Sequence, residues 1–448
     1  MAETKPYASS LEVKGIAIFS VEDEAKPYAN IKNLVTHYYH IEDITQAAYE
    51  AKMVVVDNAT NLIANMPIQG NEKVVVEVKD TFDNTYNYEY RVWTVANRLS
   101  ADRKQVYTLG LVSPEGLANE GVRLVKSEKG KISEVVESLV SNLTSVKDYE
   151  FDNDEEAGEF GLLVKTDETK NSCKIIPHRQ TVFSVIRSLQ KRGIPKTKNN
   201  KKGTAGYVFY QTRKGFNFRS FDSLVSAGPI GQDFVYTMGK RDEENANKIQ
   251  EIKYGDEINL MKKLREGAFK SVSCYFNINT GKYTESVYSM EEVWDEMEHL
   301  GSQTKLPKGA ADLSQFPTRV LSSVINNEFW YNGTESASAD SKNDLKDYQP
   351  FYLQQSIGRA GLMFNQQITI SLTGHLELCA GDCIELKVPN QQAEVLKEDG
   401  VTWDPENSGT FLIKRVTHQF HVTGNSVYTV MDLIRDSYGI QGSNSNVK

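Results

Sequence analysis

Cysteine is scarce in this sequence: 448 residues contain four, at Cys173, Cys274, Cys379 and Cys383. None of them forms a C-x-x-C pair, and four scattered thiols are too few for a disulfide framework. We therefore expect the cysteines to be buried free thiols.

The sequence also lacks any apolar run near the roughly 18 to 20 residues that cross a bilayer. Its start, MAETKPYASS, has neither the charged nor the apolar region of a signal peptide. We therefore expect a protein that is made and kept in a cytoplasm, with no membrane insertion by this chain.

An excess of basic residues is missing as well. The 51 Lys and Arg against 60 Asp and Glu give a net charge of −9, which argues against a dedicated nucleic-acid binder. One basic cluster stands in QKRGIPKTKNNKKGTAG, at Lys191, Arg192, Lys196, Lys198, Lys201 and Lys202. No aromatic residue is interleaved with it before Tyr207, so a solvated loop is favoured over a phosphate-contacting one.

Catalytic signatures are absent too, since the sequence has no P-loop, no G-x-S-x-G and no H-E-x-x-H. A zinc site remains conceivable, because strand pairing could bring together His375, Cys379, Cys383, His418 and His421. Side chains alternate along a strand, however, so His418 and His421 should face opposite sides. Core thiols and surface imidazoles are the preferred interpretation, and we predict no metal, no cofactor and no catalytic residue.

A glycosidase pair could be imagined in the acidic run DNDEEAGE, which supplies Asp152, Asp154, Glu155, Glu156 and Glu159. Glycoside cleavage needs two carboxyls at a fixed separation, one of them desolvated. Five acids in one short run are more typical of a solvated loop.

Aromatic and β-branched residues are what the sequence has in quantity, with 22 Tyr and 18 Phe in a chain that is 39% apolar and 25% charged. This is a globular composition that leans toward strands. Strand-like runs fill residues 53–57, 74–78, 88–95 and 106–112, a hairpin is predicted at 206–221, and strands return after about residue 364. The sequence therefore predicts an α+β protein that is mainly antiparallel β.

Two amphipathic helices are predicted between these strands. Ile132, Val135, Val136, Leu139, Val140 and Leu143 share one helical face. The second helix spans about 181–192 and places Val182, Val185, Ile186 and Leu189 on one stripe, with Gly193 at its end. Both are typical of core-facing helices in a small α+β domain.

The sequence contains a distant internal repeat. VYTLGLV begins at Val106 and VYTVMDL at Val427, 321 positions later, and an ungapped alignment on these two residues places Val95 on Val416 and Leu99 on Phe420. Only four of the eighteen positions from 95 to 112 are identical, but a Gly-Asx turn and an apolar strand precede each copy, at Gly70-Asn71 and Gly381-Asp382. The repeat predicts two similar antiparallel β domains, one at each end of the chain.

Four stretches in order, IQGNEKVVVEV, GYVFYQTRKGFNFRSFDSL, LTGHLELCAGDCIELKVP and FLIKRVTHQFHVTGNSVYTVMDLIRD, resemble the baseplate hub protein of contractile-tailed phages of the T-even kind. The resemblance implies a homotrimer with two tube-type β-barrel domains per chain. Such a trimer caps the tail tube on one side and holds the trimeric central spike on the other, with a channel through which DNA passes. It would belong to the tail baseplate of a virion and be assembled in the host cytoplasm.

The resemblance also implies a division of the chain into domains. The first tube-type barrel would span residues 1–112, and the second would combine 206–240 with 360–437. The α+β pieces 113–205 and 241–359 would form the cup for the spike, and 438–448 would be a flexible tail. The segment near 300–359 is longer than the family pattern needs.

Other functions remain open from the sequence. A tail-associated peptidoglycan hydrolase and a glycan-binding module that uses the many aromatic residues are two of them. A hub or spike component of a related contractile injection or secretion system is a third, although such spikes usually continue into a C-terminal β-helix and this chain ends in QGSNSNVK.

Overall fold

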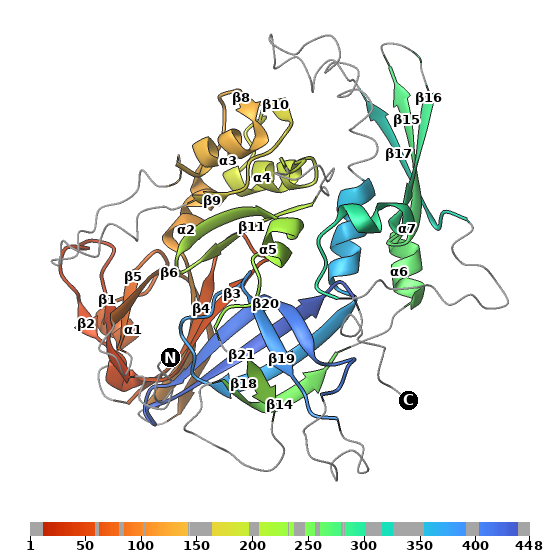
Figure 1. Cartoon of the computed structure of the whole chain (residues 1–448). Coiled ribbons are helices and arrows are strands. Elements are labelled where there is room, and N and C mark those ends of the chain that lie inside the picture. The colour runs from red at the N-terminus through yellow and green to blue at the C-terminus, as the bar shows by residue number, and fades with distance from the viewer. Residues whose placement is uncertain are drawn as a thin grey trace.

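The computed structural model describes residues 12–58, 62–79, 85–101, 104–141, 143, 164–196, 206–231, 233–236, 247–255, 260–278, 281, 283–301, 316–325, 354–390 and 403–437. Within these ranges the chain is mainly antiparallel β, with strand-rich units at both ends and the longer helices between them (Figure 1). The predicted α+β fold class, with two β-barrel units and α+β insertions, is confirmed.

The first barrel is formed by seven strands: β1 (Glu12–Ile18), β2 (Ala29–Asn30), β3 (Val35–Asp43), β4 (Glu50–Asp57), β5 (Lys73–Lys79), β6 (Thr85–Ala101) and β7 (Lys104–Val112). They lie in the order β3-β4-β7-β6-β5-β1-β2, with the short helices η2 (Lys32–Leu34) and α1 (Leu62–Asn65) in the connections. The sheet curls around one core, because the hydroxyls of Tyr38 on β3 and Tyr90 on β6 meet at 2.5 Å although two strands separate them.

The second barrel contains six strands: β13 (Phe234–Tyr236), β14 (Lys248–Tyr254), β18 (Gln366–Thr373), β19 (Cys383–Lys387), β20 (Gly409–His421) and β21 (Ser426–Arg435). Their order is β19-β13-β14-β18-β21-β20, and pairing of β19 with β20 closes the barrel. Its core is a separate cluster that includes Ile370, Phe411 and Met431, all fully buried.

The two barrels share one strand order. The order β3-β4-β7-β6-β5 in the first barrel corresponds to the order β14-β18-β21-β20-β19 in the second. All neighbouring strands in these two series are antiparallel. The units differ at the next strand, since β1 runs antiparallel to β5 whereas β13 runs parallel to β19. The repeat predicted from sequence is therefore present as a repeat of topology.

Equivalent backbone hydrogen bonds fix the turn before β5 and the turn before β19. The N–H of Asn71 donates to the carbonyl of Val92 at 2.7 Å, and the N–H of Gly381 donates to the carbonyl of Ile413 at 2.9 Å. Both donors have positive φ, +74° at Asn71 and +89° at Gly381. Glycine and asparagine are the residues that adopt this conformation at least cost.

An acidic side chain closes each of these turns in the same way. The carboxylate of Glu72 accepts the N–H of Gln69 at 2.6 Å, and that of Asp382 accepts the N–H of Cys379 at 3.0 Å. Positions 69 and 72 correspond to 379 and 382 at a common spacing, so the turns match in side-chain role as well as in backbone path.

A β-bulge also lies at the same place in both units. The register with the following strand shifts between Val92 and Thr94 in β6, and between Ile413 and Arg415 in β20. The bulges are 321 positions apart, which is the offset that the sequence repeat predicts. A bulge twists a strand locally, so both units bend at the equivalent point.

Beyond Ala96 the ungapped alignment is wrong by one position. β6 has a second bulge after Ala96. β20 is described over its whole length and has no second bulge. On the next strand, Leu111 and Leu433 hold equivalent places opposite the first bulge and are 322 positions apart. The identity between Val106 and Val427 is therefore a coincidence of sequence, although the repeat that it indicated is real.

The segment between the barrels contains a small helical layer. Its elements are α2 (Pro114–Gly121), β8 (Glu128–Lys131), α3 (Ile132–Ser141), β9 (Val164–Thr166), β10 (Ser172–Ile175), α4 (Val182–Gln190), β11 (Tyr207–Thr212), β12 (Gly215–Ser220) and α5 (Phe221–Ser226). The predicted apolar faces of α3 and α4 are buried in one cluster, and Ser113 and Thr181 cap α2 and α4. Such caps accept backbone N–H groups that the helix leaves unpaired.

A third unit follows the start of the second barrel. It contains α6 (Leu260–Glu266), β15 (Lys270–Asn277), β16 (Tyr283–Ser289), α7 (Met290–Val293), η4 (Trp294–Glu296), β17 (Arg319–Ile325) and the helical stretch 354–363. β15 lies in the middle of a three-stranded sheet, antiparallel to β16 and parallel to β17. This sheet projects away from both barrels (Figure 1).

Strand pairing differs from the predicted division at two points. The hairpin β11–β12, placed at the start of the second barrel, pairs with β9, because its Phe209, Phe216 and Phe218 fill the core beneath α3 and α4. β14, placed in the insert 241–359, belongs to the second barrel, where Ile249 is buried. Strand pairing alone does not define where a domain begins or ends, so the boundaries stay predictions.

Candidate assembly site

The residues considered for zinc do not converge. Within the described ranges no three His, Cys, Asp or Glu side chains are arranged to hold a metal ion. His418 is buried with its Nδ1 3.1 Å from the hydroxyl of Thr429, whereas His421 is half-buried and packs edge-on against His37. Cys379 and Cys383 are buried, and His375 is half-buried.

The buried thiols are poor nucleophiles. Burial raises the pKa of Cys173 to about 11 and that of Cys383 to about 12, and it raises the pKa of Cys379 further. A thiol must be deprotonated to attack a substrate or to bind a metal. These three cysteines therefore act as small core residues, and the half-exposed Cys274 is also free.

The charged clusters fall largely outside the described residues. The five acids considered as a glycosidase pair, residues 152–159, lie outside them, as do Lys198, Lys201 and Lys202 of the basic cluster. Lys196 forms an ion pair of 2.9 Å with Glu168. Hydrogen bonds from Lys131 and Lys196 lower the pKa of Glu168 to about 2.

A surface depression of about 600 Å³ lies beside α6 and β17, lined by Met261, Lys262, Arg265, Glu266 and Arg319. It contains one carboxylate among three cations. Glycoside cleavage requires two carboxyls on opposite sides of the scissile bond, so this site lacks the groups for it.

The two barrels are joined through their strand edges. β3 of the first pairs antiparallel with β20 of the second, from Asp43 opposite Arg415 to His37 opposite His421. The carboxylate of Asp43, which is buried, also lies 2.8 Å from Nε of Arg415. The pairing fuses both barrels into one sheet of thirteen strands, and Figure 1 shows β3 and β20 side by side.

Aromatic side chains pack across this joint. Tyr38 stacks on Phe420 with ring centroids 4.9 Å apart, and His40 lies parallel to His418 at 6.0 Å. Burial and the neighbouring His40 lower the pKa of His418 to about 3. The His418 ring is therefore neutral at physiological pH.

Glu42 on β3 connects three parts of the chain. Its carboxylate accepts the backbone N–H of Arg213 at 2.6 Å and that of Ala380 at 3.1 Å, and it lies 3.2 Å from Nε2 of His40. The other nitrogen of His40 is 2.7 Å from the hydroxyl of Tyr90. Burial disfavours the charge on Glu42, but the hydrogen bonds from His40, Arg213 and Ala380 outweigh it and lower its pKa.

Solved structures with a similar fold exist for this chain with its repeated barrel and main-chain joint. No protein-family model matches the sequence, and no curated protein matches it. The fold is similar to solved tail proteins from Neisseria meningitidis, at 11% identity over 95% of this chain and 98% of that one with a TM-score of 0.49, and from prophage MuSo2 of Shewanella oneidensis, at 9% identity over 95% and 99% with a TM-score of 0.49. It is also similar to a component of the type VI secretion system of E. coli, at 10% identity over 91% of this chain and 76% of that one, with a TM-score of 0.39.

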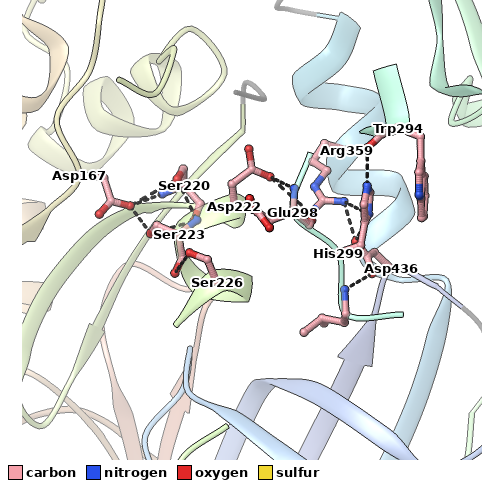
Figure 2. Close-up of polar contacts among 11 residues, drawn as sticks. Asp167, Ser220, Asp222, Ser223, Ser226, Trp294, Glu298, His299, Arg359 and Asp436 are labelled. Atoms are coloured by element: carbon pink, nitrogen blue, oxygen red, sulfur yellow. Dashed lines mark hydrogen bonds and ion pairs between the residues drawn. The ribbon is translucent and has the colours of Figure 1, made fainter. Parts of the chain in front are cut away.

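A second buried polar cluster attaches the third unit to the second barrel (Figure 2). Arg359, on the helical stretch 354–363, is completely buried and lies 2.6 Å from Asp436, which follows β21. It also lies 3.5 Å from Asp222 of α5 and donates to the carbonyl of Glu298 at 2.5 Å. One guanidinium thus contacts three separate segments, as the fork of five N–H donors of arginine allows.

His299 completes this cluster. Its Nδ1 lies 2.9 Å from Asp436 and its Nε2 2.8 Å from the carbonyl of Trp294, on whose ring it stacks at 3.5 Å (Figure 2). The same Nδ1 lies 3.3 Å from a terminal nitrogen of Arg359, so His299 contacts both members of the Arg359–Asp436 ion pair. Burial works against the charge of Asp436, but Arg359 and His299 outweigh it and lower the pKa of Asp436 to about 2.

Asp167 fixes the start of α5 in a similar way (Figure 2). Its carboxylate accepts the N–H of Ser220 at 2.8 Å and the hydroxyl of Ser223. Ser220 in turn caps the helix by accepting the N–H of Ser223. The helix that carries Asp222 toward Arg359 is therefore held at its first turn.

Sequence reasoning missed Glu42 and Arg359 because their partners are remote. Glu42 contacts backbone groups 171 and 338 positions away, and Arg359 contacts Asp436 at 77 positions. The one available signal was alternation in HYYHIED, which places Tyr38, His40 and Glu42 on the same face of β3.

The three-stranded sheet of the third unit exposes an apolar face. The side chains concerned are all 45 to 64% exposed and lie in register across the strands: Phe276, Tyr283, Val287, Val320 and Val324. Contiguous exposed apolar side chains of this kind often mark an interaction site.

Among the described residues, no helix is long and apolar enough to cross a membrane.

Proposed function

We propose that three copies of this chain form the ring-shaped hub of a contractile phage tail baseplate, which adapts a sixfold tail tube to a threefold central spike. The observation that carries the proposal is the joint between β3 and β20, which places two barrels of one topology edge to edge in one chain.

The duplication supplies the symmetry that such an adapter needs. A closed ring of n chains presents 2n similar barrels, so three chains present six. One face of the ring then matches a hexameric tube, while the parts that are not duplicated repeat only three times and match a trimeric spike. The segments 113–205 and 241–359, apart from β14 of the second barrel, are these unduplicated parts.

The apolar face of the β15–β16–β17 sheet is suited to the spike. The sheet projects away from both barrels (Figure 1), and its apolar face carries the exposed Phe276, Val287 and Val320. Introducing Lys at Val287 and Val320 should abolish spike binding and leave the ring intact, because charges would be buried in the contact. A matched Glu77→Lys variant, at an exposed position on β5 of the first barrel and outside the segments assigned to the spike, should bind normally.

The net charge of −9 favours passage of DNA through the ring, because an acidic protein offers a polyanion little to bind. We infer that DNA crosses the hub in transit and makes no lasting contact with it.

The proposal is tested by the mass of the purified protein in solution and by electron-microscopy class averages viewed along its axis. The expected result is a mass of three chains and a ring with six similar lobes. A monomer at micromolar concentration without a threefold mate would refute it. Release of fragments from purified peptidoglycan would instead support a hydrolase.

A further inference from the structure

The joint within the chain uses only one of two equivalent pairs of edges. It joins β3 of the first barrel to β20 of the second. By strand order, the counterpart of β3 is β14 and the counterpart of β20 is β6. In strand order these counterparts lie on opposite sides of the joint, β14 three strands from β20 and β6 three strands from β3. The described residues place no strand beside them at the equivalent positions.

The outer half of β6 has a vacant edge where β20 is covered. Within the described residues, β5 pairs with β6 only as far as Arg91, and the paired residues from Thr94 to Ala101 have a partner on one side alone, in β7. In the second barrel β19 likewise stops at Leu412, and β3 covers the same edge of β20 from Arg415 to His421. The covered stretch of β20 therefore has an uncovered equivalent in β6.

The edge of β14 that faces away from β18 also lacks a paired strand over part of its described length. Within the described residues β13 pairs only with Lys248 and Ile249, and Glu251 to Lys253 pair on one side alone, with β18. The equivalent edge of β3 is the one that pairs with β20.

We propose that the edge of β14 in one copy of the chain pairs antiparallel with the outer half of β6 in a second copy, repeating between chains the joint that β3 and β20 make within one. The inference rests on the proposed ring and names the contact that would close it. Each barrel would pair its β3 or β14 edge with the β20 or β6 edge of the next barrel. Contacts that repeat head to tail in this way can close a ring.

The bulges set the register of this contact. β3 shifts register between Val35 and His37 and β14 between Ile249 and Glu251, so Glu251 takes the place of His37. Its partner is found in the hairpin beyond the second bulge of β6.

There the last residues of β6 correspond to the last residues of β20. Leu99 lies opposite Val106 and Gln419 opposite Tyr428, so Leu99 corresponds to Gln419 and not to Phe420, as the ungapped alignment had placed it. By the same count, Ala101 corresponds to His421.

Two residue pairs between copies follow from the counterparts. His421 opposite His37 predicts Ala101 opposite Glu251, and Gln419 opposite Tyr39 predicts Leu99 opposite Lys253.

A second copy of this chain is favoured as the partner of these edges, because its β6 and β14 would repeat the pairing that β20 and β3 already make within one chain. The two edges also carry large exposed apolar side chains: Trp93 is 57% exposed and Leu99 70% on β6, and Tyr254 is 44% exposed on β14. An uncovered strand edge with apolar side chains pairs readily with other chains, and a defined partner prevents uncontrolled pairing.

The proposal is tested with paired cysteines in a Cys274→Ser background, since the other native thiols are buried. Residues directly opposite on antiparallel strands have Cβ atoms about 4.5–5.5 Å apart, close to what a disulfide spans. The test variants are Ala101→Cys with Glu251→Cys and, independently, Leu99→Cys with Lys253→Cys. All four positions are exposed, so the fold should tolerate them.

Two controls accompany the test. His37→Cys with His421→Cys is the equivalent pair inside one chain and should form a disulfide without any change of mass. Glu77→Cys with Glu251→Cys places one cysteine on the exposed face of β5, away from the proposed edge, and should remain reduced.

The expected result after mild oxidation is covalent dimer and trimer on a non-reducing gel, with nothing larger and most of the protein in the trimer. A native mass of three chains without cross-linking by either pair would overturn the joint while the proposed ring survived. Cross-linked chains of open length would support the joint and refute the ring of three. A monomer that does not cross-link would refute both.

Discussion

Arg359 should contribute more to stability than any exposed ion pair of the chain. Replacing it with Met removes the cation and keeps most of the side-chain volume. Two carboxylates would then lose this cation, Asp436 with a fully buried side chain and Asp222 with one that is 11% exposed. Removing one member of a buried ion pair typically costs about 3–5 kcal/mol.

The sign of the effect follows from the pKa of Asp436. Its folded value of about 2 lies below the unfolded value of 3.8, so the stability it contributes is present above pH 3.8 and is lost as the pH falls through 2. Without Arg359 this pKa should rise, and the loss should begin at higher pH. The double variant Arg359→Met with Asp436→Asn should recover part of the stability, because no unpaired charge then remains at Asp436.

The assay is urea unfolding at pH 7, followed by tryptophan fluorescence, to which Trp294 beside His299 contributes. The matched control is Lys196→Met, which removes an ion pair whose partners are 58% and 44% exposed and should change the stability little. If Arg359→Met costs no more than this control, the cluster does not hold the third unit to the barrel.

Two further outcomes are expected. The pKa of His418 is about 3 in the fold against 6.5 unfolded, so its contribution is complete above pH 6.5 and falls by about 2 kcal/mol between pH 6.5 and 5, at about 1.4 kcal/mol per unit. His418→Gln should therefore flatten the decline of urea midpoints over that range, and an unchanged decline would contradict this. Gly381→Ala should cost about 2–5 kcal/mol, because φ is +89° and a Cβ would overlap Tyr210. Gly231→Ala, with positive φ but open space, should cost only about 1–2 kcal/mol in the same urea unfolding assay, and equal losses would refute the overlap.

Local patterns predicted the elements that depend on local physics. The apolar stripes of α3 and α4 are buried as predicted, because helical periodicity sets which face is buried. The turns at Asn71 and Gly381 were found for a similar reason, since positive φ restricts the residue type.

What failed was the choice of neighbours. Alternation predicts that the hairpin β11–β12 consists of two strands, but an edge can pair with any strand that the rest of the fold brings to it. No strand was predicted at β14, which lay inside the insert 241–359. The buried charges escaped for the same reason. A carboxylate such as Glu42 has the same sequence signal in a core as at the surface, and the N–H groups that make its burial tolerable belong to Arg213 and Ala380.

The alignment error has its own physical origin. The extra bulge after Ala96 adds one residue to β6 without changing the fold around it, and Asn97 with φ of +52° is its only local mark. A bulge inserts a residue while the flanking pairs continue, so identity scores cannot locate it.

The contact between β3 and β20 is made by amide and carbonyl groups that every residue except proline supplies. Mutation can therefore exchange nearly all of the side chains along such a seam and leave its geometry intact. Two barrels of one topology can therefore share few identical residues and still pair through the same backbone geometry.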